Sequence, residues 1–158
     1  MKKLLLLLTL APCTAIGQSY DVLFIGNSYT YSNNLPQQVA GLASSFGDTI
    51  NYDSSTPGGA TFNAHSSNAS VSPVGISWKN SIALDSMINL YSGDNSHPSI
   101  YGSYLAACTF YSSIFKKSCV GSAFWPVGVD SATAVFLQTV ASNTVLDTLS
   151  TWNIFNAD

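Results

Sequence analysis

The sequence contains neither arginine nor glutamate, and its charge rests on five lysines and eight aspartates among 158 residues. Two of the lysines, Lys2 and Lys3, lie at the extreme N-terminus. Without them, three lysines face eight aspartates, a net charge of about −5. A chain with no basic stripe cannot neutralise a row of phosphates, so we exclude nucleic acid as a partner. An anionic membrane surface is disfavoured for the same reason.

Long hydrophobic runs are also missing. The longest, residues 4–10, is far shorter than the roughly 20 residues that span a bilayer. It follows a basic start and leads to small residues ending at Gly17, a pattern that predicts a signal peptide over residues 1–17. We therefore expect an exported protein, secreted or periplasmic, with no membrane span. A lipoprotein-type cut before Cys13 is the alternative, and Pro12 argues against it.

Cysteine is scarce, and removal of the leader leaves only Cys108 and Cys119. An exported chain permits a disulfide between them. An unbroken helix would separate their Cα atoms by about 16 Å, whereas a disulfide needs less than about 7 Å. Only a helix that stops near Lys117 and folds back could join them, so the pairing stays open.

The remaining residues, 18–158, fit a single domain with alternating strands and helices. Residues 21–25 form a continuous apolar run, which predicts a strand buried on both faces of a parallel sheet. An amphipathic helix with Asn34 as its N-cap should follow. The further predicted elements are a strand at 49–54, a short strand at 69–75, and helices at 78–87, at 99–115 and after the N-cap Asp130.

Ser28 stands just beyond the first predicted strand, where open α/β sheets place their ligands. A serine hydroxyl needs a base within hydrogen-bond reach to become a nucleophile. The chain offers two histidines, and only His97 has a neighbouring carboxylate, Asp94, that can reach its Nδ1 atom. His65 has none nearby. The set predicts acyl transfer by Ser28, His97 and Asp94.

The two segments that carry these residues, 22–30 and 94–99, resemble the first and last sequence blocks of the SGNH (GDSL-like) hydrolases. The resemblance implies a flavodoxin-like α/β/α three-layer sandwich and ester hydrolysis without a metal or other cofactor. It implies Ser28 as nucleophile, His97 as base and Asp94 as the residue that orients the base. The aspartate usual before the nucleophile is Asn27 here.

The same resemblance implies an oxyanion hole made by the backbone N–H of Ser28, by Gly58 or Gly59, and by a side-chain amide. No counterpart of that amide follows a strand; Asn63, His65 and Asn68 could replace it or be plain loop residues. The chain near 60–70 is also too short for a parallel crossover, which needs a dozen or more residues. We therefore expect a shortened parallel sheet of about three strands flanked by helices.

Two functional hypotheses follow, and a third is that the motifs are coincidental in a secreted adhesion module. The first is a secreted SGNH-type serine esterase that hydrolyses small acyl or acetyl esters, including those on carbohydrate. The alternative is an inactive or fragmentary SGNH-like protein that acts at most as a glycan- or partner-binding module. The oligomeric state cannot be predicted from the sequence.

Overall fold

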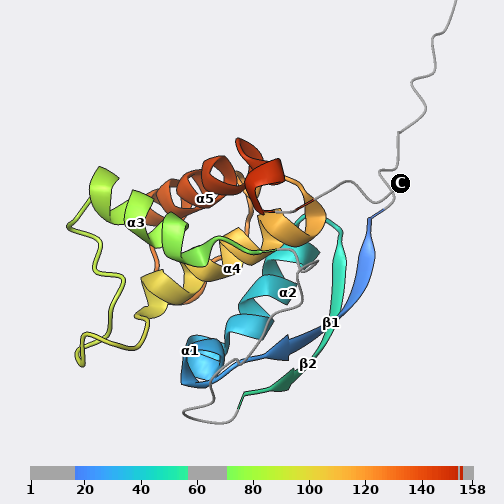
Figure 1. Ribbon diagram of the computed structural model, residues 1–158, viewed down its shortest axis with the longest axis horizontal. Helices are drawn as coiled ribbons and strands as arrows, with labels where there is room; N and C mark the ends of the chain where they lie inside the picture. The colour runs from blue at the N-terminus through green and yellow to red at the C-terminus, as the bar shows by residue number, and fades with distance from the viewer. Residues whose placement is uncertain (1–16, 57–70, 153, 155–158) are drawn as a thin grey trace, which may run out of the picture.

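The computed structural model describes residues 17–56, 71–152 and 154. Within them, β1 (Ser19–Ile25) and β2 (Thr49–Ser55) form a two-stranded parallel sheet beside a group of helices (Figure 1). The chain is therefore mixed α/β, as the alternating pattern predicts. The predicted leader and the predicted turn at Gly58 and Gly59 lie outside the described residues.

The helix α2 (Leu35–Ser45) lies between the two strands in the chain and ends just before Gly47. Gly47 adopts a φ of 78°, which favours glycine, and its N–H bonds to Ser44 O while that of Asp48 bonds to Ala43 O. Asp48 is then buried in an ion pair with Lys117. Burial raises its pKa, but hydrogen bonds, first from the Gln18 N–H, outweigh this and lower the pKa below its usual value.

Asn34 precedes α2, as predicted, but its side chain does not cap the helix. The residue has a left-handed backbone, and its amide group bonds to Gln37 Oε1 instead. By contrast, the Asp130 carboxylate accepts from two backbone N–H groups at the start of α5 (Ser131–Leu146), which confirms the predicted cap.

Only one face of the sheet is buried, which corrects the expectation for β1. Phe24 points inward and meets Phe110 edge to face. On the opposite face, Leu23 and Ile25 keep 59% and 60% of their surface exposed. None of the described residues buries these two side chains. The apolar run in β1 therefore does not show that a second layer packs on this face of the sheet.

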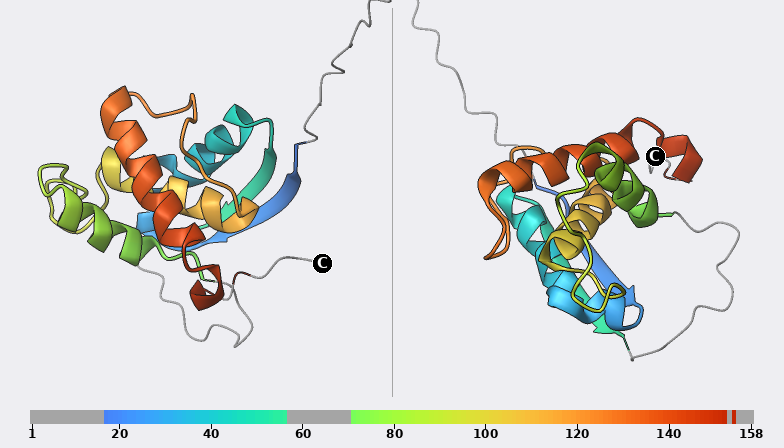
Figure 2. Two further views of the ribbon diagram at one scale, coloured as in Figure 1. Left: turned by 90° about the horizontal axis from the view of Figure 1, so that it is seen from above. Right: turned by 90° about the vertical axis from the view of Figure 1, so that its left-hand side faces the viewer.

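The helix α4 (Ile100–Phe115) lies at the centre of the helical part, in contact with α2, α3 (Val74–Leu84) and α5. Figures 1 and 2 show α3 and α5 together on the side of α4 away from the sheet. Tyr104, Leu105 and Cys108 of α4 are completely buried. The core is therefore mainly a helix-on-helix core, with the sheet packed at its side.

The predicted strand at 69–75 is wrong in its described part, since 71–73 form no strand and Val74 already begins α3. The described sheet accordingly has two strands rather than about three. The α3 helix also ends at Leu84, before the predicted Met87. A short 3₁₀ helix, η2 (Leu149–Trp152), follows α5.

The chain folds back after Phe115, where Lys116 takes a left-handed conformation. Cys108 and Cys119 are both buried, and both are free thiols. Burial, together with a hydrogen bond to Cys119, raises the pKa of Cys108 well above its usual value. The early helix end thus brings the cysteines together, but the structure contains no disulfide between them.

Candidate active site

Ser28 occupies the first position of a short helix, α1 (Ser28–Tyr31), and only Gly26 and Asn27 separate it from the end of β1. Asn27 caps this helix by accepting a hydrogen bond from the Tyr29 N–H. Gly26 makes the turn possible, because a Cβ atom there would lie 2.0 Å from the Thr30 hydroxyl oxygen. The first N–H groups of a helix have no acceptor within the helix, so that of Ser28 is available to a ligand.

His97 connects Ser28 to Asp94. Its Nε2 atom lies 3.0 Å from Ser28 Oγ, and its Nδ1 atom lies 2.6 Å from Asp94 Oδ2. An ionised carboxylate only accepts hydrogen bonds, so Nδ1 carries the proton and Nε2 is left to accept from the serine hydroxyl. The three predicted residues therefore form one hydrogen-bonded chain.

The loop before α4 holds the Asp94 carboxylate firmly. Its Oδ1 atom accepts from the Ser92 hydroxyl and from the backbone N–H groups of Ser96 and His97. These bonds, that of Ser92 first, hold the pKa of Asp94 well below its usual range. Asp94 thus keeps its negative charge although about half of its side chain is exposed.

A bridge between distant segments fixes the serine relative to the histidine. Asn33 lies in the 3₁₀ turn η1 (Ser32–Asn34), and its amide donates to Pro98 O and to Ser103 Oγ. Its φ of 54° is left-handed, a conformation that asparagine tolerates better than most residues. The segment after Ser28 is therefore tied directly to the start of α4.

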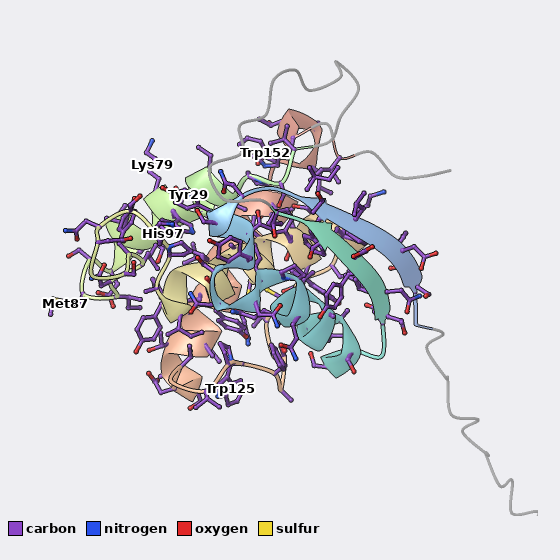
Figure 3. All side chains as sticks on the ribbon, turned by 90° about the horizontal axis from the view of Figure 1, so that it is seen from below. Tyr29, Lys79, Met87, His97, Trp125 and Trp152 are labelled. Atoms are coloured by element: carbon purple, nitrogen blue, oxygen red, sulfur yellow. The ribbon has the colours of Figure 1, made fainter. Side chains whose placement is uncertain are left out.

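Tyr29 makes a second connection across the site. Its ring stacks on that of His97, with centroids 5.1 Å apart, and its hydroxyl group lies 2.6 Å from Ser96 Oγ. Figure 3 shows Tyr29 and His97 beside each other, far from Trp125. Sequence reasoning missed Tyr29, Asn33, Ser92 and Ser96. The one available signal was that Tyr29 directly follows the proposed nucleophile.

The oxyanion side is less complete. Of the predicted donors, the described residues contain only the N–H of Ser28. Gly58 and Gly59 lie outside them, as do Asn63, His65 and Asn68. Two amides lie in the described part of the chain between β2 and Asp94: Asn80 donates to Thr144 Oγ1, and Asn89 accepts from the Tyr91 N–H through its Oδ1.

Together, these residues define an α/β protein with a Ser–His–Asp hydrogen-bonded chain beyond the end of a parallel strand. Comparison with family models, with curated proteins and with solved structures finds no match for this chain. In the described ranges, no helix is long and apolar enough to cross a membrane. Nor do those ranges gather three or more His, Cys, Asp or Glu side chains that could hold a metal ion.

Proposed function

We propose that this protein is an exported serine esterase of SGNH type, with Ser28 as nucleophile, His97 as base and Asp94 as the residue that orients the base. The observation that carries the proposal is the unbroken chain of hydrogen bonds from Asp94 through both ring nitrogens of His97 to Ser28. A structural histidine has no need of a partner on each nitrogen in this order, whereas a general base does.

The proposed reaction has two halves. Ser28 Oγ attacks the ester carbonyl carbon while His97 Nε2 takes the hydroxyl proton, and the N–H of Ser28 donates to the developing oxyanion. Asp94 stabilises the imidazolium. The C–O bond to the alcohol then breaks, and Nε2 returns its proton to the leaving oxygen. Water, deprotonated by His97, attacks the acyl-serine in the same way and releases the carboxylic acid.

The finer fold assignment belongs to the same proposal. A parallel β1–α2–β2 unit with the nucleophile directly after β1 is what a flavodoxin-like sheet would contain. In this reading, Gly58 or Gly59 after β2 supplies a second oxyanion donor. Small acyl esters, including those on carbohydrate, are within the reach of such a site, which is open to solvent: 39% of the His97 side chain is exposed.

A fluorophosphonate probe tests this proposal, because it reacts covalently only with an activated serine. We expect one adduct on intact mass, located on the peptide that contains Ser28 and lost in Ser28→Ala. Ser131→Ala is a matched control, since Ser131 also begins a helix after a side-chain cap but, among the described residues, does not bond to a histidine. A folded protein that takes up no probe would instead support the non-catalytic binding module.

A further inference from the structure

A pocket of about 840 Å³ opens beside the Ser28–His97 pair. Its walls come from four helices, α1, α2, α3 and α4, and from the loop that carries His97. Aromatic and aliphatic side chains dominate the lining, among them Tyr29, Val74, Trp78, Ile82, Tyr91 and Phe110. Pockets for drug-sized ligands measure roughly 300–1,000 Å³, so an acetyl group would leave most of this volume empty.

The pocket lies next to the proposed reaction centre, because the residues adjacent in sequence to Ser28 and His97 line it. Tyr29 follows the nucleophile in sequence and stacks on His97, while Ser96 precedes His97, and both residues line the pocket. The pocket is thus the neighbouring space toward which a group bonded to the carbonyl carbon under attack by Ser28 would extend.

The wall made by α3 is held in place by close packing. The Trp78 ring meets Tyr91 edge to face, with centroids 4.9 Å apart. It also lies against the backbone of α4, where a Cβ atom at Gly102 would come within 2.7 Å of the indole. A glycine at this position is thus what lets the tryptophan form the wall.

The exposed apolar groups indicate what the pocket binds. Tyr29, Ile82 and Tyr91 keep 47%, 41% and 39% of their surface exposed, and all three face one pocket. Two of its polar groups are already occupied, because Ser96 bonds to Tyr29 and Ser103 to Asn33. A sugar would need many hydrogen-bond partners there, whereas a hydrocarbon chain would need only the apolar surface.

We infer that this pocket binds the acyl chain of the substrate, and that the preferred ester carries a linear chain of about six to ten carbons rather than an acetyl group. This inference rests on the proposed esterase function and specifies its substrate class. Each methylene group that enters the pocket raises the apparent affinity about two- to fourfold.

The first test is the chain-length dependence of kcat/KM for p-nitrophenyl esters from acetate to decanoate, below their micellar concentrations. We expect a rise of about 10²-fold or more from acetate to octanoate. Gly75 offers a way to fill the pocket, because it lines it and a Cβ atom there meets nothing within 4 Å. Gly75→Trp should reduce the rise at least tenfold, whereas the size control Gly75→Ala should retain it.

The second test measures binding without turnover. In Ser28→Ala, methyl octanoate should change the fluorescence of Trp78, and Trp78→Phe in the same background should abolish that change, because Trp125 and Trp152 do not line the pocket. Methyl acetate should have no effect at equal concentration.

The outcomes separate the two proposals. A fluorophosphonate adduct on Ser28 with equal kcat/KM for acetate and octanoate, and no binding of methyl octanoate, overturns the acyl pocket and leaves the esterase intact. Binding of methyl octanoate without any serine adduct supports the pocket and overturns the esterase.

Discussion

The two sides of Ser28 are built in different ways. On the base side, the loop between α3 and α4 holds Asp94 and His97, and Asn33 ties that loop to the nucleophile. On the oxyanion side, the described residues contribute one predicted donor, the N–H of Ser28. The hydrogen bonds that hold Asp94 and His97 lie within one loop. This part of the site can therefore form even where the sheet has only two described strands. The second donor in the proposed oxyanion hole, Gly58 or Gly59, lies outside the described residues.

Removing the base should cause the largest loss of activity. His97→Ala leaves the Ser28 hydroxyl without an acceptor for its proton, and we expect kcat/KM for an active ester to fall about 10⁶-fold. Steady-state kinetics with circular dichroism as a folding control measures this. Activity within tenfold of the wild type would mean that His97 is not the catalytic base.

Asp94→Asn should cost less, about 10⁴-fold in kcat/KM. The donors that point at Oδ1 would fix the amide so that its NH₂ group faces His97 Nδ1. The NH₂ group then donates, and the proton moves to Nε2, the wrong tautomer for a base. Retention of more than a tenth of the activity would show that solvent can replace the carboxylate.

The pH dependence tests the charge on Asp94. Because its pKa in the folded protein is well below the usual value, the stabilising bonds to its carboxylate persist above about pH 4 and are lost only at lower pH. Asp94 should therefore contribute no proton uptake to the pH dependence of kcat/KM above about pH 4. A limb that requires two protons above pH 4 would contradict this account.

Breaking the bridge between the two segments should have an intermediate effect. Asn33→Gly keeps the left-handed backbone but removes the bonds to Pro98 and Ser103, and we expect kcat/KM to fall about tenfold through misplacement of Ser28. The matched control is Asn34→Gly, which has a similar φ of 53° and a side chain bonded to Gln37 alone. Equal losses of kcat/KM in both variants would mean that the hydrogen bonds of Asn33 do not position Ser28.

The smallest effect belongs to the Tyr29 hydroxyl. Tyr29→Phe removes the bond to Ser96 but keeps the ring stacked on His97, so we expect a two- to fivefold loss, about what an exposed hydrogen bond contributes. Ser96→Ala should show the same loss, and the double variant no further loss. Additive losses would mean that the two residues act independently.

Patterns within one segment could be predicted from the sequence. The Asp130 cap and the reach of Asp94 to His97 span three residues each, so local spacing specifies them. Contacts between distant segments could not: the amide of Asn33 bonds to a carbonyl 65 residues away, and nothing in the sequence indicates that pairing.

Apolar runs were the misleading signal. The continuous run in β1 indicates hydrophobicity but not which layer covers each face, and Leu23 and Ile25 are exposed. Likewise, the stretch 69–75 suggests a short strand, yet Val74 begins a helix after Pro73. A short sequence around a proline is compatible with both a strand and a helix, and tertiary packing decides between them.

The most direct measurement of the central claim is the detection of the acyl-enzyme. The protein is mixed with p-nitrophenyl octanoate, quenched in acid during turnover, and analysed by mass spectrometry of its peptides. We predict an octanoyl group on the peptide that contains Ser28, absent from Ser28→Ala and strongly reduced in His97→Ala. Turnover of the ester with no acyl group on that peptide, or with the group on another residue, would contradict the assignment of Ser28 as the nucleophile.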